Sequence, residues 1–324
     1  MSQSGTGPAR TGCANTAPGT TTVASSQDYF IMRTFRTDLR RTLRDSEDLP
    51  TLPDILMLVR KTIRKKSSNA DKIGDIISQD PSMTSNILKL ANSAYYSAGG
   101  HPVSSISDAI VRLGLSETLR ICTTLSIINS FHNLGGYTDH RKFWLHSITT
   151  SAVALAVKKS CRKKVNCDDD QIQVAGLVHD IGVLILDQYF HETAVEIWDD
   201  SLRNNIPTFI NETEILGMDH GEIGGYTIRR WNMAAPVVQA VMYHHQPTRR
   251  DHAYVSCAQV IHVADRICSF KDVGSSRDSI EVEGLTDEIL GELGLDIDRI
   301  LSLREEARAE MSRSDVVLSL SGKV

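Results

Sequence analysis

The sequence predicts an all-α fold. From about Asp28 nearly to the C-terminus, apolar residues recur at intervals of three and four, which is the spacing of one face of a helix. Alternating apolar and polar residues, the pattern of a half-buried strand, are scarce. With 324 residues, of which 41% are hydrophobic, the chain is long enough to bury a sizeable core in one large domain or two.

Residues 1–27 are rich in Gly, Ser, Thr, Ala and Pro and hold almost no large apolar side chain, so we expect a disordered tail. An N-terminal helical part should follow over residues 28–132. Its first amphipathic helix has Pro53 in the opening turn and continues to Ile63 at helical spacing.

Capping residues divide the next helices of this part. Asn69 is an N-cap, and Pro81 ends one helix and opens another after a sharp corner. Gly114 is placed to cap a helix C-terminus, and Ser116 is the expected N-cap of the helix that follows. We therefore expect several short helices before residue 132.

Longer helices are expected in the second half, over residues 140–161, 170–187, 189–204, 208–217, 219–232, 235–245 and 253–270. Residues 158–170 are charged, but basic residues that close one helix and aspartates that open the next suit the helix dipoles, so we expect a solvated corner. Residues 271–284 make a polar link. A shorter helix and a charged amphipathic helix should then occupy residues 285–312, before a ragged tail that ends at residue 324.

Composition and charge exclude some functions. The formal net charge of -5 gives no general attraction to nucleic acid or anionic lipid, so we expect binding to neither DNA nor a membrane. The longest apolar runs, such as residues 181–186, are far shorter than the roughly 20 residues that cross a bilayer. The chain has no CxxC pair, and nothing at its N-terminus resembles a signal peptide, so we expect a reducing cytoplasm. The six cysteines are Cys13, Cys122, Cys161, Cys167, Cys257 and Cys268.

An ordered series of histidines and aspartates falls on, or at the ends of, the expected helices. Neutral imidazole and carboxylate are ligands that suit Zn, Mn, Fe or Co, and seven of them could hold two ions. Singly, each residue has a structural explanation, because a half-buried histidine often bonds the backbone through one nitrogen. Their number favours a shared metal site. The series comprises His146, His179, Asp180, His220, His244, His245 and Asp265.

Asp180 is the candidate bridging ligand, because a carboxylate has one oxygen for each of two metals. On a continuous helix over residues 170–187, His179 would point about 100° away from Asp180. A close pair of ions would clamp a phosphate and lower the pKa of a bridging water, which is the chemistry of phosphodiester hydrolysis. Asp180 is accordingly the expected catalytic residue. Gly224 and Gly225 are expected to allow close helix packing.

Several longer motifs then carry a resemblance. They are "LPTLP" at 49–53, "ISQDPSMTSNILKLANSAYY" at 77–96, "SISDAIVRLG" at 105–114, "AGLVHDIG" at 175–182 and "HGEIGGYTIRRWNMAAPVVQAVMYHHQP" at 220–247. With these motifs the chain resembles the HDOD family, a signalling offshoot of the HD-domain metal-dependent phosphohydrolases, from Leu49 to Ser269. The resemblance implies a multi-helix HD-domain-like bundle over residues 28–270, with its HD-like part over 133–270.

The resemblance also implies ligand roles. The related HD-GYP phosphodiesterases carry their ligands in the order H, HD, H, HH, D, and this chain is similar at each position. By that likeness Asp180 would bridge two divalent transition-metal ions. One ion would be held by His146, His179, Asp180 and Asp265, and the other by Asp180, His220, His244 and His245.

The chain departs from the HD-GYP pattern in ways that bear on catalysis. Val183 stands where those enzymes carry a phosphate-binding lysine, and "HHQPTRRDHAY" lacks the Gly-Tyr-Pro signature. Lys142 replaces the glutamate that would hold a third ion. Arg249 and Arg250 could neutralise a substrate phosphate if their loop folds over the site, and are otherwise exposed loop arginines.

Three functions are compatible with this reading. The first is a cytoplasmic signalling module that binds a partner protein through its N-terminal half and C-terminal amphipathic helix, with a retained metal-stabilised or ligand-sensing pocket. The second is an active metal-dependent phosphohydrolase on a nucleotide or cyclic dinucleotide. The third, a di-iron enzyme that uses oxygen, follows from other HD-domain relatives. We favour the first.

Overall fold

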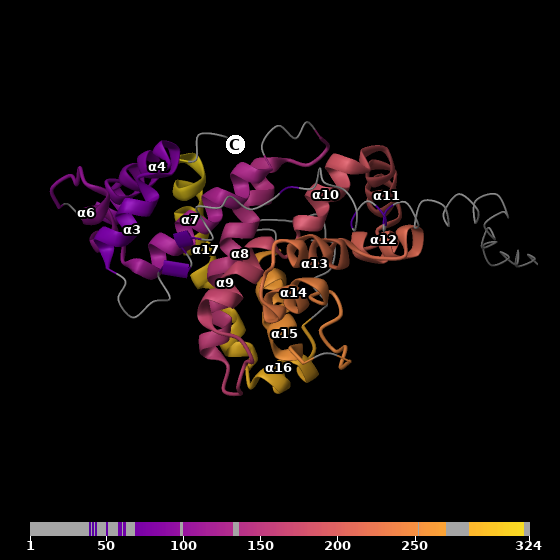
Figure 1. The fold of residues 1–324 in the computed structure, drawn as a ribbon. Coiled ribbons are helices and arrows are strands. Elements are labelled where there is room, and N and C mark those ends of the chain that lie inside the picture. The colour runs from indigo at the N-terminus through magenta and orange to yellow at the C-terminus, as the bar shows by residue number, and fades with distance from the viewer. Residues whose placement is uncertain are drawn as a thin grey trace, which may run out of the picture.

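The computed structural model describes residues 39, 41, 43, 50, 58–59, 61–62, 69–97, 100–131, 136–251, 253–269 and 285–320. Within these ranges the regular secondary structure is entirely helical, which confirms the predicted all-α class (Figure 1). None of the described helices is both long and apolar enough to cross a membrane. The expected tail over 1–27 and link over 271–284 lie outside the described residues.

An N-terminal lobe is defined here as α3 to α7, of which α3, α4 and α6 lie at one end of the molecule (Figure 1). Its core is a separate cluster that includes Ile73, Ile87 and Ile110, all nearly inaccessible to solvent. The lobe comprises α3 (Ala70–Ile77), α4 (Pro81–Ala91), α5 (Ala94–Ser97), α6 (Ile106–Leu113) and α7 (Leu115–Ser130).

Two of the predicted caps of this lobe are confirmed, and one is wrong. Asn69 Oδ1 accepts a hydrogen bond from Lys72 N at 3.0 Å, and Gly114 ends α6 with a φ of 83°. Ser116 does not cap α7, because α7 already begins at Leu115, directly after Gly114. The positive φ of Gly114 ends α6 and lets α7 begin at the next residue, which leaves Ser116 inside the first turn of α7.

A second lobe is defined as α8 to α16. The long helix α8 is at its centre and packs against α9, α15 and α17. Trp144, Ile148 and Val157 of α8 are buried in the core of this lobe. The lobe comprises α8 (His140–Ser160), α9 (Asp169–Val178), α10 (Ile181–Tyr189), α11 (His191–Asn204), α12 (Thr208–Leu216), α13 (His220–Arg230), α14 (Ala235–Met242), α15 (Val255–Cys268) and α16 (Asp287–Leu293).

The continuous helix predicted over 170–187 is wrong, because the chain turns between α9 and α10 at His179 and Asp180. The reason is the close contact of α10 with α13. A Cβ on Gly182 would lie 1.9 Å from the backbone oxygen of His220, and one on Gly224 would lie 3.2 Å from Gly182 N. The turn directs α10 into this contact. The predicted role of Gly224 in close helix packing is thereby confirmed.

Helix α17 (Ile297–Leu320) runs past the end predicted at residue 312 and joins the two lobes. Leu303 and Ala307 belong to the core of the second lobe, whereas Val317 belongs to that of the N-terminal lobe. The buried part of this amphipathic helix, which was expected to bind a partner, thus packs within the chain. Ile297 near its start is 61% exposed.

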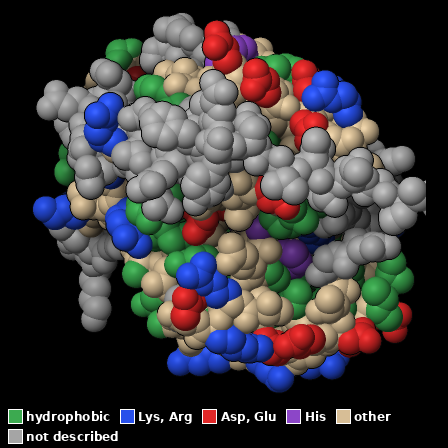
Figure 2. Space-filling model, turned by 90° about the vertical axis from the view of Figure 1, so that its right-hand side faces the viewer, with side chains coloured by type: hydrophobic (Ala, Val, Ile, Leu, Met, Phe, Trp, Pro, Cys, Tyr) green, Lys and Arg blue, Asp and Glu red, His purple; other side chains and the backbone are tan. Residues whose placement is uncertain are grey.

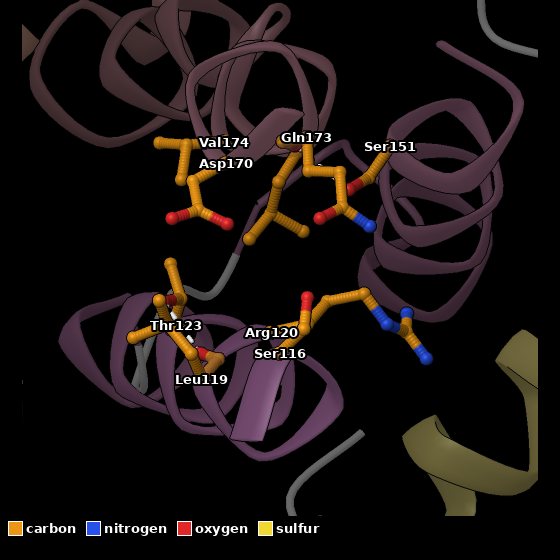
Figure 3. Close-up of a pocket in the computed structure, with 9 residues that line it drawn as sticks. Ser116, Leu119, Arg120, Thr123, Ser151, Asp170, Gln173 and Val174 are labelled. Atoms are coloured by element: carbon orange, nitrogen blue, oxygen red, sulfur yellow. Dashed lines mark hydrogen bonds between the residues drawn. The ribbon is translucent and has the colours of Figure 1, made fainter. Parts of the chain in front are cut away.

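An ionic contact between α7 and α17 also links the lobes. Glu117 accepts hydrogen bonds from Arg120 Nε at 2.8 Å and Nη2 at 2.6 Å, and Arg313 Nη2 of α17 lies 3.6 Å from the same carboxylate. Beside it, a pocket opens between α7 and the pair α8 and α9 (Figure 3). The pocket is lined by Ser116, Leu119, Arg120, Thr123, Ser151, Asp170, Gln173, Val174 and Leu177.

We expect Glu117→Gln to lower the free energy of unfolding by about 2 kcal/mol at pH 7, because buried Arg120 would lose its charged partner. Burial raises the pKa of Glu117, but its hydrogen bond and ion pair with Arg120 outweigh burial and hold the pKa below its usual value. A carboxyl of this kind contributes stability above its unfolded pKa, and the contribution is lost as the pH falls through its folded pKa.

Urea denaturation of the wild type and Glu117→Gln at pH 7 and below about pH 4 checks this. The difference in unfolding free energy should shrink in acid. Glu305→Gln is the matched control, because Glu305 pairs with Arg308 on the same helix and is 67% exposed. That substitution should change little. An equal loss in the two variants would contradict a role for Glu117 between the lobes.

Candidate metal centre

The structure brings together all seven residues of the predicted series, from five separate segments. His146 lies in α8, His179 and Asp180 occupy the turn between α9 and α10, and His220 is the first residue of α13. The remaining residues follow α14 or lie in α15. We call the seven the His/Asp cluster: His146, His179, Asp180, His220, His244, His245 and Asp265.

One side of the His/Asp cluster faces Oδ2 of Asp180. His179 Nε2 lies 3.2 Å and His146 Nε2 lies 3.7 Å from that oxygen. Asp265 Oδ1 is 3.1 Å from His146 Nε2 and 3.6 Å from His179 Nε2. Two imidazole nitrogens and two carboxylates therefore converge on one point.

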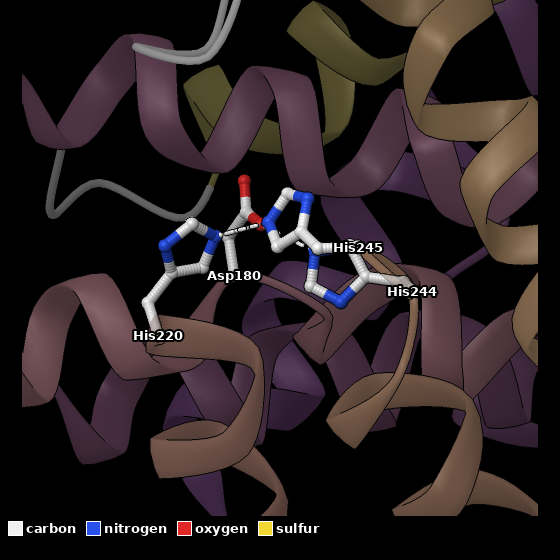
Figure 4. A group of neighbouring side chains, drawn as sticks. All are labelled: Asp180, His220, His244 and His245. Atoms are coloured by element: carbon white, nitrogen blue, oxygen red, sulfur yellow. Dashed lines mark hydrogen bonds and ion pairs between the residues drawn. The ribbon is translucent and has the colours of Figure 1, made fainter. Parts of the chain in front are cut away.

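The other side faces Oδ1 of Asp180 (Figure 4). His220 Nε2 lies 3.4 Å and His244 Nε2 lies 3.5 Å from this oxygen. His245 Nε2 is 2.7 Å from His220 Nε2. The two oxygens of Asp180 thus belong to different groups of ligand-type atoms, as a bridging carboxylate requires. The 100° divergence expected of His179 and Asp180 does not arise, because they lie in the turn rather than within one helix.

Backbone carbonyls orient two of the histidines. His179 Nδ1 is 2.8 Å from the Gly176 oxygen, and His244 Nδ1 is 2.7 Å from the Val241 oxygen. A carbonyl oxygen only accepts, so each Nδ1 carries a hydrogen, and Nε2 is the nitrogen that each ring turns toward the cluster. His179 and His244 therefore make the backbone hydrogen bond that is expected of a structural histidine. The other ring nitrogen of each, Nε2, remains available as a metal ligand.

Helix α12 supplies two supporting residues that sequence reasoning missed. Glu212 Oε2 accepts hydrogen bonds from His220 N at 2.8 Å and Nδ1 at 2.7 Å, while its Oε1 accepts from Trp198 Nε1 at 3.1 Å. The Phe209 ring stacks on His245, with centroids 4.4 Å apart. No local signal marks Glu212, because a glutamate within an amphipathic helix usually faces solvent.

Electrostatics favour a cation within the cluster. Burial lowers the pKa of His179, but the Asp180 and Asp265 carboxylates outweigh burial and raise it to about 10. Burial raises the pKa of Asp180, yet the neighbouring imidazoles hold it well below its usual value. Both carboxylates are therefore anionic at neutral pH. Burial, with His244 and His220 nearby, lowers the pKa of His245, which keeps that ring neutral.

The donor set fits divalent transition-metal ions. His244 Nε2 is buried and makes no hydrogen bond with the described residues. Two groups have ligand atoms close enough to share an ion, namely Asp180 with His220, His244 and His245, and Asp180 with His146 and His179. Imidazole nitrogen and carboxylate oxygen suit Zn, Mn, Fe or Co.

The cluster is largely enclosed, since Asp180 is 5% exposed and His179 is fully buried. Histidine atoms are visible in a recess near the middle of the face in Figure 2. Basic and acidic side chains are mixed over the described part of that face, which shows no broad region of one sign.

The two arginines that were candidates for phosphate binding have acidic partners. Arg249 Nε lies 2.7 Å from Asp251 Oδ1, and its guanidinium stacks over the Tyr243 ring at 4.5 Å. Arg250 is paired with Glu292 of α16. Both arginines lie in the loop between α14 and α15. Lys142 is exposed, and its ammonium lies 3.4 Å from Asp139 Oδ2.

We expect Glu212→Ala to weaken metal binding by about 10- to 100-fold, because His220 would lose the acceptor that orients its ring. Glu212→Gln, which keeps an acceptor oxygen, should restore most of the affinity. Competition with a chromophoric chelator measures the dissociation constant, and thermal melting monitors the fold. Asp187→Asn is the control, because Asp187 is also buried and accepts from His191 Nδ1 at 2.8 Å but lies outside the cluster. Equal weakening in the control would contradict the role of Glu212.

Comparison with known proteins yields a family match. The model of the HDOD domain family matches residues 49–247, more than half of the chain. An uncharacterised protein of Treponema pallidum is 26% identical over 243 residues. The alignment covers 74% of this chain but 46% of the Treponema protein, so the chain spans about half the length of that relative.

Solved structures show the same fold. An HDOD domain protein of unknown function from Geobacter sulfurreducens has a TM-score of 0.70 at 24% identity, over 88% of this chain and 97% of its own. A candidate signal transduction protein from Marinobacter aquaeolei has a TM-score of 0.72 at 19% identity, over 92% of this chain and 66% of its own. A candidate phosphohydrolase from Shewanella amazonensis has a TM-score of 0.66 at 20% identity, over 87% of this chain and 97% of its own.

Proposed function

Because the chain belongs to the HDOD domain family, we propose that it is a signal-transduction protein whose His/Asp cluster binds two divalent metal ions. The observation that carries the proposal is the convergence of six other ligand-type side chains around Asp180, whose two oxygens face different imidazoles. The family match and the donor geometry both support it.

The proposed ligands form two subsites that share Asp180. Oδ2 of Asp180 would serve the first subsite with His146, His179 and Asp265. Oδ1 would serve the second with the three remaining histidines. Ions held in this way would cross-link α8, α13, α15 and the turns after α9 and α14, so metal loading would stabilise the second lobe.

Burial and charge favour a sensing or structural role over hydrolysis. The cluster is almost closed to solvent, and Val183 supplies no positive charge where the related phosphodiesterases carry a lysine. The charges of Arg249 and Arg250 are paired with Asp251 and Glu292. The Marinobacter candidate signal transduction protein shares the fold, which is consistent with this role. We propose that the chain acts in the cytoplasm by contact with a partner protein.

The alternative is a metal-dependent phosphohydrolase that acts on a nucleotide or cyclic dinucleotide. The unbroken donor series favours it, because two close ions supply a clamp for phosphate and an activated water. In that case Asp180 would position both ions at the reacting phosphate. The Shewanella candidate phosphohydrolase has the same fold, but fold alone does not determine activity.

Elemental analysis of the purified full chain tests the proposal, together with turnover assays of cyclic dinucleotides and nucleotide phosphodiesters. We expect about two equivalents of metal and no turnover that depends on Asp180. Turnover that disappears in Asp180→Ala would establish the alternative. A folded protein that binds no divalent metal, even after dialysis against Zn, Mn, Fe or Co, would overturn both functions.

The partner contact has its own test. A pull-down that uses the folded Asp180→Asn variant should retain the same partner as the wild type if the contact surface lies outside the cluster. Loss of the partner from the folded variant would instead show that the metal pocket controls binding.

A further inference from the structure

Two thiols meet at one edge of the second lobe, away from the His/Asp cluster. Cys167 precedes Asp168, the N-cap of α9, and Cys257 lies in the first turn of α15. The two thiols lie close enough to shift each other's pKa in opposite directions. The preceding residues are also in contact, since Asn166 N donates to Ser256 Oγ at 3.2 Å. The two segments therefore lie side by side, although 90 positions separate their cysteines in the sequence.

The two sulfurs differ in exposure and acidity. Cys167 is half-buried, whereas Cys257 is fully buried. The Cys257 thiol and the ammonium of Lys158 lower the pKa of the Cys167 thiol in spite of its burial. The Cys167 thiol in turn raises the pKa of Cys257. Cys167 is therefore the nucleophile of the pair, and Cys257 stands within reach to resolve it.

The other described cysteines do not share this environment. Burial raises the pKa of Cys161 to about 11 and that of Cys122 and of Cys268 to about 12. Cys122 and Cys268 are also inaccessible to solvent. Among the described cysteines, Cys167 alone combines partial exposure with a lowered thiol pKa and a second thiol in contact.

We propose that Cys167 and Cys257 form a redox pair that hydroperoxides oxidise to a disulfide. The Cys167 thiolate attacks one peroxide oxygen, the O–O bond breaks, and hydroxide leaves when the peroxide is hydrogen peroxide. Sulfur has then lost two electrons and is a sulfenic acid. The Cys257 sulfur attacks the Cys167 sulfur, the S–O bond breaks, and water leaves with the proton of the Cys257 thiol.

The position of this disulfide would couple it to the metal centre. Helix α9 starts beside Cys167 and leads to His179 and Asp180, while α15 carries Asp265 two turns after Cys257. The bond would tie together the starts of two helices that already pack on each other. We expect it to slow the separation of these helices and hence metal release. This coupling rests on the proposed metal site, whereas the thiol pair does not.

Peptide mapping of the full chain tests the thiol pair. After hydrogen peroxide treatment, non-reducing mass spectrometry should find the Cys167 and Cys257 peptides linked, with the loss of two hydrogen atoms, and dithiothreitol should reverse the link. In Cys257→Ala, dimedone should label Cys167, and Cys268→Ala should behave as the wild type. A Cys161–Cys167 link, labelling of Cys257 in Cys167→Ala, or no link between Cys167 and Cys257 would overturn the proposal.

Metal extraction tests the coupling. EDTA should remove Zn several-fold more slowly from the oxidised than from the reduced full chain, and Cys167→Ala should lose this difference. A mapped disulfide with equal extraction rates would refute the coupling and leave the redox pair established. A chain that forms the disulfide but binds no metal would refute the proposed metal site and the coupling together, so the two failures are distinguishable.

Discussion

Replacement of Asp180 with alanine is expected to abolish metal binding at both subsites, from about two equivalents to none. Asp180 is the one residue whose two oxygens face both groups of imidazoles, at 3.2 Å from His179 and 3.4 Å from His220. Its loss would remove a charged ligand from each subsite and the charge that draws the two ions together. Elemental analysis after desalting measures the stoichiometry.

Single histidine variants are the matched controls for this experiment. His146→Ala should weaken the first subsite and His220→Ala the second, so each variant should retain about one equivalent of metal. Thermal melting before and after metal addition should confirm that every variant is folded. Two equivalents bound to folded Asp180→Ala would contradict the bridging arrangement and require ligands other than those assigned.

The second large effect is expected from Gly182→Ala, which should lower the free energy of unfolding by roughly 3 kcal/mol or more. The new Cβ would lie 1.9 Å from the His220 oxygen and 2.9 Å from Gly224 N. Both neighbours are backbone atoms, so no side chain can move aside. Helix α10 would have to shift away from α13, which would also displace Asp180 from His220 and weaken the second subsite.

Urea denaturation of Gly182→Ala measures this loss, and the metal content of the folded fraction measures the displacement. Gly291→Ala is the matched control, because nothing lies within 4 Å of a Cβ at that position in α16. The control should be neutral or slightly stabilising, since alanine is the better helix former. A Gly182→Ala protein as stable as the control would show that α10 and α13 do not pack as closely as described.

The helical fold and the family could be predicted from the sequence because their signals are local. Asn69 and Gly114 act within one helical turn of their own position, and the apolar spacing in the matched segment is read over one or two turns. The seven members of the His/Asp cluster were also found in this way, because each stands beside apolar residues on a helix or at its end. Their role as metal ligands remains a prediction.

Other features depend on contacts between distant segments, which local patterns do not encode. The turn at His179 and Asp180 exists because Gly182 must meet the backbone of His220, and Glu212 becomes a supporting residue only where α12 packs beside α13. The extent of α17 is likewise set by packing on both lobes. By itself the sequence determined the helical class and the inventory of chemical groups, because periodicity and residue type are properties of single segments. Only the tertiary structure decided which atoms converge, because distance and burial are properties of pairs of segments.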